Sequence, residues 1–537
     1  MEKITRRSFV AGTAGLAILS NPLLASAAET ADIVWEAEAD YVIIGTGAAG
    51  LSAAATCGLE ELGDCLILEA APEALRGGNS RVCGQGTFCP MTVEGCIAYQ
   101  TDLNRPYVVE PELVQSWAEN ICENGTWLEE EVGAQISYRQ SAEFPEAEGA
   151  EFIGHYASAV GRGEDGSGGI WQAIADCVAG FDIPIYYDSR AVYLIHDVET
   201  KEVQGVTTED GRNFKARKAV ILGAGGFEWN QEMMDQFNTC GFVGCKGIGT
   251  IYNRGDGIKM AAALGAQLWH MNNFSGKTFG LRVGAADDDS RIVGSNFSGD
   301  LHDYIFLDPE GKRFMYEESR GNARHGKVYE GGTWADLRYP GGSHAVFTQA
   351  SYDAAPACGT VGFSTRLAAI ETLTTNDALL EAGIITKSET VAELAQAIGA
   401  DEAVLQAELD KYNRYVANGY DADFHRGQIL GEAENEAAAG TRGAAVVETQ
   451  GFELTPIEPP FYSYEMIPFV INSQGGPKRD ATGNIVDLAG NPIPRLYGAG
   501  EMGCIYPYKY NVGGNFSEAI SSGRLAMRSA SALEPWA

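Results

Sequence analysis

The sequence predicts an α/β fold that a second region, of α+β type, interrupts. Three observations lead to this prediction. An apolar run before Gly45 ends in glycines and is followed by alanines, which is the order expected for a strand, a tight turn and a helix. The chain contains 66 glycines, which indicates many tight turns. Its 537 residues exceed what one compact core usually holds, so we expect two domains or one domain with a large insertion.

The first element is a βαβ unit of the kind that binds a dinucleotide. A strand is expected from Ala39, a helix from Ala48, and a second strand at Cys65–Leu68 that ends at Glu69. Within residues 45–50 (Gly-Thr-Gly-Ala-Ala-Gly), the first glycine makes the turn, the second lets the backbone approach a pyrophosphate, and the third lets helix and strand pack closely. The helix N-terminus attracts the anion, and Glu69 can accept hydrogen bonds from ribose hydroxyls. We therefore predict a Rossmann-like dinucleotide-binding domain.

Five further segments resemble the flavoprotein superfamily of fumarate reductase and succinate dehydrogenase. They are Arg76–Ser80 with Gly84–Gly86, Gly223–Phe227, Gly255–Ala261, Leu496–Glu501 and Gly513–Ala519. The resemblance implies an FAD-binding domain of the glutathione-reductase type. Relatives with covalent flavin carry a histidine where this chain has Asn79 and Ser80, so it also implies non-covalent FAD. The cofactor-binding residues predicted in this way are Gly45, Thr46, Gly47, Ala48, Ala49, Gly50, Glu69, Ala70, Gly77, Gly78, Asn79, Ser80, Val192, Gly225, Asp256, Glu501, Asn515 and Phe516.

The same segments indicate the domain boundaries. We expect residues 36–266 and 460–537 to form the FAD-binding domain, with a β-meander at residues 183–216. Residues 267–459 lack the flavin segments and are expected to form an α+β cap, or substrate, domain. A helical pattern from Thr390 to Tyr415 lies inside this cap.

The family's proton donor is expected shortly after residue 312. In soluble fumarate reductases it is an arginine that follows a segment similar to Lys312–Glu317. Arg320 stands one position earlier than that pattern implies, and Arg324 is a second choice. Glutamates beside the arginine could hold it and relay protons. A surface arginine paired with a glutamate is the alternative interpretation. Tyr316 of this segment is predicted to contact the substrate.

The C-terminal segments depart from the fumarate-reducing pattern. Asn511 stands where an arginine would clamp a substrate carboxylate, and Asn472–Gly476 replaces a histidine-containing segment. Fumarate is therefore not expected. Tyr506, Tyr508 and Tyr510 resemble instead the tyrosines of flavin-dependent ketosteroid dehydrogenases and reductases, in which phenols polarise a ring carbonyl and transfer protons.

The catalytic residues predicted by this comparison are Arg320, Tyr506, Tyr508 and Tyr510, and the substrate-binding residues are Asn511, Lys509, Tyr316, Gly475 and Gly476. The alternating tyrosines could instead be ordinary strand or core residues. Lys509 could still receive one carboxylate.

These features predict a reductase of an activated C=C bond in an enone, such as a 3-ketosteroid or a polyphenol-like compound. Hydride would come from flavin N5 and a proton from the protein. A reductase of unsaturated carboxylates, such as an arylacrylate, urocanate or a fumarate-like compound, is the alternative. A flavoprotein that only relays electrons is a third interpretation, but a pure carrier needs no large cap over its flavin.

The N-terminus predicts export. Arg6 and Arg7 precede Ser-Phe and a small, apolar run that ends in Ala25-Ser26-Ala27, which resembles a twin-arginine signal peptide of residues 1–27. We therefore expect a periplasmic or cell-surface protein. No later stretch is apolar enough to span a membrane.

Charge and missing motifs indicate the partners. A formal net charge of −35 argues against nucleic acid, which requires basic patches. The sequence contains no second nucleotide fingerprint, no haem motif and no predicted metal site. Electrons should then come from a separate carrier, a cytochrome or FMN protein linked to membrane quinol, as in anaerobic respiration.

Overall fold

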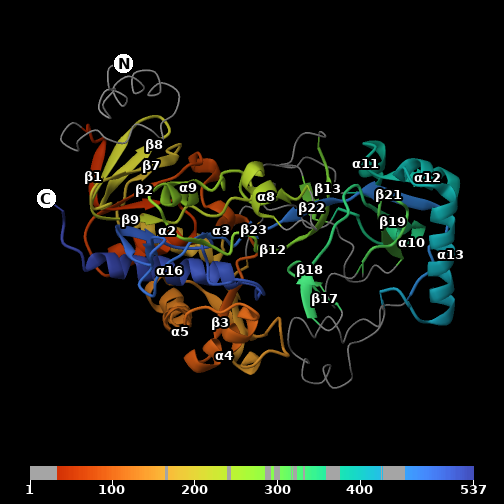
Figure 1. The fold of residues 1–537 in the computed structure, drawn as a ribbon, viewed down its shortest axis with the longest axis horizontal. Coiled ribbons are helices and arrows are strands. Elements are labelled where there is room, and N and C mark those ends of the chain that lie inside the picture. Colours follow the sequence, from red (N-terminus) through yellow and green to blue (C-terminus); the bar gives the residue numbers. More distant parts are fainter. Residues whose placement is uncertain are drawn as a thin grey trace, which may run out of the picture.

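The computed structural model describes residues 33–161, 163, 167–238, 244–284, 292–294, 303–315, 317, 323–330, 333–358, 375–424, 426 and 454–536. These residues form a mixed α/β protein, with the N-terminal and C-terminal segments of the described chain gathered in one half of the molecule (Figure 1). The predicted signal peptide, residues 1–27, lies outside the described residues, as do Tyr316 and Arg320. Within the described part of the chain, no helix is long and apolar enough to cross a membrane.

The largest sheet has eight strands, in the order β25-β26-β9-β1-β2-β6, with β7 and β8 attached beside β9. Its strands are β1 (Ala37–Ile44), β2 (Cys65–Leu68), β6 (Ile185–Tyr186), β7 (Ala191–His196), β8 (Val203–Thr208), β9 (Asn213–Leu222), β25 (Asn484–Val486) and β26 (Pro492–Gly498). Strands β6, β2, β1, β9 and β26 run parallel, so their carboxyl ends meet at one edge. Strands β7, β8 and β9 form an antiparallel meander.

Helices α2 (Ala48–Leu59) and α16 (Gly514–Ser531) pack against each other beside this sheet, with α7 (Ile170–Ala179) next to α2 (Figure 1). Two glycines allow the close packing. A Cβ on Gly50 would lie 1.9 Å from the Gly45 carbonyl oxygen, and a Cβ on Gly523 would lie 2.2 Å from that of Ala49. Both helices therefore begin close to the carboxyl edge of the sheet.

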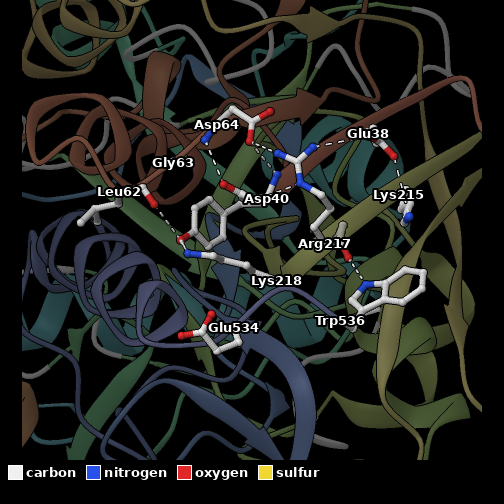
Figure 2. Close-up of polar contacts among 12 residues, drawn as sticks. Glu38, Asp40, Leu62, Gly63, Asp64, Lys215, Arg217, Lys218, Glu534 and Trp536 are labelled. Atoms are coloured by element: carbon white, nitrogen blue, oxygen red, sulfur yellow. Dashed lines mark hydrogen bonds and ion pairs between the residues drawn. The ribbon is translucent and has the colours of Figure 1, made fainter.

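A polar cluster holds the amino-terminal side of the sheet together (Figure 2). Arg217 of β9 pairs with Glu38 and Asp40 of β1 and with Asp64, which precedes β2. Burial alone would raise the pKa of Asp40, but its hydrogen bond to Arg217 and the charge of Arg217 lower it below the usual value. The Trp536 indole donates to a backbone carbonyl of β9 at 2.5 Å. These contacts fix the strands without occupying the carboxyl edge.

The region beyond the eight-stranded sheet contains smaller sheets and helices (Figure 1). One sheet has the order β10-β22-β13-β14, with β10 (Lys246–Gly247), β13 (Thr278–Arg282), β14 (Ile292–Gly294) and β22 (Ile467–Val470). Another has the order β15-β19-β21-β20, with β15 (Tyr304–Leu307), β19 (His344–Thr348), β20 (Thr386–Ser388) and β21 (Phe461–Glu465). Because β21 and β22 pair with these strands, the smaller sheets extend past residue 459, where we expected the cap to end.

Further elements complete the described chain. They are α3 (Gly78–Val82), β3 (Thr87–Pro90), α4 (Val93–Asn104), α5 (Pro111–Cys122), β4 (Ile136–Gln140), β5 (Ile153–Ser158), α8 (Gln231–Phe237), α9 (Asp256–Ala263), β11 (Leu268–Trp269), β12 (Phe274–Ser275), β16 (Ala323–Arg324), β17 (Lys327–Glu330), β18 (Thr333–Asp336), α10 (Gln349–Ala354), α11 (Asn376–Glu381), α12 (Val391–Ile398), α13 (Glu402–Asn418), β23 (Asn472–Ser473) and β24 (Gly476–Pro477). Strands β3, β5 and β4 form one antiparallel sheet, and β16, β17 and β18 form another.

A buried ionic cluster stabilises the region around β15 and α13. The Arg313 guanidinium binds both carboxylate oxygens of Glu317, at 2.6 and 2.7 Å, and Asp421 at 2.9 Å, and all three side chains are fully buried. Burial opposes the charge on Arg313, yet the two carboxylates outweigh this effect and raise the pKa of Arg313. Glu317, which we expected to relay protons, is thus part of a structural ion pair.

Candidate active site

A cavity of about 780 Å³ opens at the carboxyl edge of the eight-stranded sheet. The predicted cofactor residues that line it are Gly45, Gly47, Ala48, Ala49, Glu69, Ala70, Gly78, Asn79, Ser80, Gly225, Asp256, Glu501, Asn515 and Phe516. Thr46, Gly50, Gly77 and Val192 do not line it. Thr46 and Gly77 instead support the wall, since the Gly77 N–H donates to Thr46 Oγ1 at 2.9 Å. The residues predicted from distant segments thus converge on one space.

Two helix N-termini face this cavity. Helix α2 begins after Gly47 and α16 after Gly513, and neither has a side-chain cap or an acidic residue in its first turn. The Ala48 N–H donates to Ser80 Oγ and the Asn515 N–H to Tyr510 Oη, and the positive ends of the two helix dipoles favour an anion or an electron-rich group in the cavity. Both side-chain heteroatoms of Asn515 are also buried without a hydrogen-bond partner among the described residues. These groups fit the pyrophosphate and the heterocyclic edge of a flavin dinucleotide.

Glu69 lies at the carboxyl end of β2 and is held in a fixed orientation. Its Oε2 accepts from the Thr46 N–H and its Oε1 from the Ala71 N–H, each at 2.8 Å. Oε2 also accepts from the Thr46 hydroxyl, and Oε1 can accept a second hydrogen bond. The carboxylate lines the cavity, so it fits the ribose-binding role predicted from its position.

Glu501 and Glu228 form a buried carboxyl pair beside the cavity. Asn253 Nδ2 donates to Glu228 Oε1 at 2.7 Å and to Glu501 Oε1 at 2.9 Å, and Asn79 Nδ2 donates to Glu228 Oε1 at 2.8 Å. Burial, followed by the charge of Glu228, raises the pKa of Glu501 well above its usual value, and burial raises that of Glu228. The pair therefore favours holding a proton. Sequence analysis missed Glu228, although it directly follows the glycine-rich segment at residues 223–227.

The three predicted tyrosines have different surroundings. Tyr510 lines the cavity, and its Oη accepts from the Asn515 N–H at 3.2 Å. Tyr506 is buried behind it, with the two rings edge-to-face at 5.2 Å, and does not line the cavity. Tyr508 Oη donates to the Trp334 carbonyl at 2.6 Å and also lies outside the lining. Tyr510 is thus the tyrosine of this segment with access to a ligand.

His325 and Glu143 are two polar residues that sequence analysis missed. His325 lies in the turn between β16 and β17, lines the cavity, and contacts the Tyr510 ring edge-to-face at 4.9 Å. Its Nε2 is 3.2 Å from Glu143 Oε2, which also accepts from the Val512 N–H at 2.6 Å. The only sequence signal was the proximity of His325 to Arg324, whose side chain is outside the described part.

Asn511, Lys509, Gly475 and Gly476, the predicted substrate-binding residues that the structure describes, do not line the cavity. Asn511 is buried, because its Oδ1 accepts from Tyr99 Oη at 2.7 Å and its Nδ2 donates to the Val512 carbonyl at 2.9 Å. Lys509 Nζ lies 5.7 Å from the ring centre of Phe144. Gly475 and Gly476 permit close packing, since an added Cβ would come within 2.4 and 2.5 Å of neighbouring backbone atoms. Tyr316 and Arg320 fall outside the described residues.

Replacing Glu69 tests the cofactor site. We expect Glu69→Ala to raise the Kd for FAD by about 10- to 100-fold, because it removes a charged hydrogen-bond acceptor facing the ligand. Fluorescence titration of the flavin-free protein with FAD measures this change. Glu73→Ala is the matched control, since Glu73 is an exposed acid four residues further along. Equal affinities in the two variants would contradict the assignment of Glu69.

Comparisons with known proteins agree with this geometry. Residues 40–517 match the family described as FAD binding domain. A digoxin reductase of Eggerthella lenta is 25% identical over 96% of this chain and 91% of that protein. A urocanate reductase of the same species is 26% identical over 87% of this chain and 70% of that protein. The crystal structure of a 3-ketosteroid delta1-dehydrogenase from Sterolibacterium denitrificans has a TM-score of 0.72 at 18% identity, covering 92% of this chain and 99% of that chain. The chain therefore belongs to the FAD binding domain family and is an FAD-dependent oxidoreductase, as its resemblance to the fumarate reductase flavoproteins predicted.

Proposed function

We propose that this flavoprotein reduces an activated C=C bond conjugated to a carbonyl, in an enone such as a 3-ketosteroid or a polyphenol-like compound. The observation that carries the proposal is the phenol of Tyr510 in the cavity wall, next to the uncapped start of α16. Similarity to a digoxin reductase along nearly the whole chain, and to the fold of a ketosteroid dehydrogenase, supports it.

FAD, when bound, supplies the hydride, and Tyr510 polarises the acceptor. Tyr510 Oη accepts from the Asn515 N–H, so its own O–H remains available to the carbonyl oxygen of an enone. Burial raises the pKa of Tyr510 above its ordinary value, which keeps the phenol protonated at neutral pH. A hydrogen bond to that oxygen stabilises the negative charge that develops there during reduction.

His325 with Glu143 is a source for the proton that the substrate carbon must receive. The imidazole lines the cavity beside Tyr510, and its Nε2 lies 3.2 Å from the Glu143 carboxylate. Because Nε2 faces Glu143, Nδ1 is the nitrogen directed to other partners. Arg320, which the family resemblance implies as proton donor, remains the alternative.

Further parts of the proposal concern the domains, the attachment of FAD, the location of the protein and its electron supply. We infer that residues 36–266 and 460–537, apart from β21 and β22, form a Rossmann-like domain and that the intervening region caps the cofactor, since His325 of that region lines the cavity. FAD would be non-covalent, because Asn79 and Ser80 are engaged in protein hydrogen bonds. Precipitation with acid should then leave the flavin in solution. Export by the twin-arginine route and electron supply by a quinol-linked cytochrome or FMN protein complete the proposal.

A substrate panel is the direct test of the reaction. The FAD-loaded protein is reduced anaerobically with a viologen dye, and its reoxidation by enones, arylacrylates, urocanate and fumarate is followed by absorbance. We expect neutral enones to reoxidise it and NADH not to reduce it rapidly. Reoxidation by urocanate or arylacrylates alone would favour the alternative function, for which similarity to a urocanate reductase is the support. Reoxidation by none of them would favour an electron-relay protein.

Removing the Tyr510 hydroxyl should slow the chemical step. We expect Tyr510→Phe to lower kcat by about 10²- to 10³-fold with an enone, because one hydrogen bond to the developing oxyanion is lost. Tyr508→Phe should lose much less activity, since the Tyr508 hydroxyl already donates to the Trp334 carbonyl. Stopped-flow rates of flavin reoxidation separate the two variants. A larger loss in Tyr508→Phe would reverse their roles.

The proton source can be tested by chemical rescue. His325→Ala should lower kcat by about 10²- to 10⁴-fold, the usual range for losing a general acid, while substrate KM changes little. Added imidazole should restore part of the rate, which a purely structural defect would not permit. Glu143→Gln should act in the same direction. Full activity in His325→Ala would leave Arg320 as the donor.

A further inference from the structure

The sheet β3-β5-β4 forms one wall of the cavity. Its strands lie outside the sequence segments that were predicted to bind the cofactor. Ser137 and Arg139 lie on β4, Ser141 follows it, and all three line the cavity. His155 of β5 stands opposite Arg139 in the antiparallel register and lines it too. Side chains two residues apart, and directly opposite across strands, share one face of a sheet. These residues therefore form one polar surface directed at the cavity.

Arg139 gives this surface a permanent positive charge. It is the one arginine or lysine among the described residues that line the cavity. Its guanidinium makes no ion pair with any carboxylate that the structure describes, although the chain has 73 acidic and only 38 basic residues. A neutral enone needs no such cation. In a protein with net charge −35, a cation in the cavity offsets the general repulsion of an anionic ligand.

The surface is connected to the predicted reaction centre. His155 Nε2 lies 2.7 Å from the Val512 carbonyl oxygen, and Val512 is two residues from Tyr510. The pyrophosphate site at the start of α2 belongs to a different wall, built by the β1–α2 turn. An anion bound by Arg139 would thus belong to the substrate and lie beside the group that Tyr510 contacts.

We infer that Arg139 binds a carboxylate of the substrate, which is therefore an enone that also carries an anionic group. A guanidinium matches a carboxylate with two parallel hydrogen bonds. The inference rests on the proposed reduction of a C=C bond and narrows its substrate class. It also provides an anion site on a different element from Asn511, whose amide is engaged inside the protein.

The test compares two ligands with the same carbon skeleton, one with a charged carboxylate and one with a neutral ester. The probes are 3-benzoylpropanoate, which contains no reducible C=C bond, and its methyl ester. Their Kd values for the oxidised, FAD-loaded protein are measured from changes in the flavin absorbance spectrum, so no turnover is required. The corresponding benzoylacrylate and its ester then provide kcat and KM with a reduced viologen dye. Variants are Arg139→Gln, Arg139→Lys and, as matched control, Arg414→Gln on the exposed side of α13.

We expect the wild-type protein to bind the acid more tightly than the ester. Arg139→Gln should raise the Kd and KM of the acid by about 10- to 100-fold and leave the ester unchanged, while Arg139→Lys should recover part of the loss. Arg414→Gln should match the wild type. Higher salt should weaken binding of the acid only.

Three results would overturn the inference. They are equal affinity of the wild type for acid and ester, equal losses for both ligands in Arg139→Gln, and a reduced FAD content in that variant, which would assign Arg139 to the cofactor. Failure of the proposed function would give a different experimental result. In that case the acid binds through Arg139, but no unsaturated compound of either charge reoxidises the reduced flavin.

Discussion

Close backbone packing at a few glycines is the constraint on which the rest of the structure depends. A Cβ on Gly50 would overlap the Gly45 carbonyl oxygen, and one on Gly513 would lie 2.6 Å from that of Gly86. Only because these contacts are made without side chains can α2 and α16 both begin at the carboxyl edge of the sheet. Two helix N-termini that face one cavity are unfavourable in isolation, since the positive ends of their dipoles lie at the same space. They become favourable when a dinucleotide supplies acceptors. The arrangement of the two helices therefore contributes to the free energy of cofactor binding.

Local sequence patterns predicted the parts of the fold that local physics determines. The strand, turn and helix at residues 37–59 follow from hydrophobic period and from glycines that take conformations other residues avoid. Thr390 likewise caps α12, because its hydroxyl accepts from the Glu393 N–H at 3.2 Å. The end of the inserted region was harder to predict from the sequence. Strands β21 and β22 carry no flavin segment. Their partners β19, β13 and β10 lie more than a hundred residues away in sequence, and β20 lies more than seventy residues away. Such long-range pairing leaves no local signal.

The residues of the candidate site fall into the same two groups, those that local sequence patterns predict and those whose positions depend on the folded chain. The predicted cofactor residues that line the cavity, such as Gly47 and Ser80, belong to recognisable sequence segments. Side chains elsewhere in the cavity wall could not be predicted in this way. Tyr506, Tyr508 and Tyr510 alternate as a strand would, yet residues 505–513 form no strand, so the alternation did not put the three phenols on one face. Asn511 was predicted to stand where the fumarate reductases have an arginine, but its contacts with Tyr99 and Val512 are revealed only by the folded chain.

The electrostatics of the cavity explain how one family can act on different substrates. At the cofactor end the positive potential comes from helix N-termini. The acids there are paired, as Asp256 is with Arg190 and Lys259, are held by N–H donors, as Glu69 is, or favour holding a proton, as the Glu228–Glu501 pair does. None of this depends on the substrate. Elsewhere in the cavity wall the polar side chains lie on separate elements, His325 on one sheet and Arg139 on another. These side chains can be replaced by others without changing the position of a helix or a glycine. Substrate choice can therefore change while FAD binding stays constant, which is consistent with relatives of this chain named for compounds as different as digoxin and urocanate.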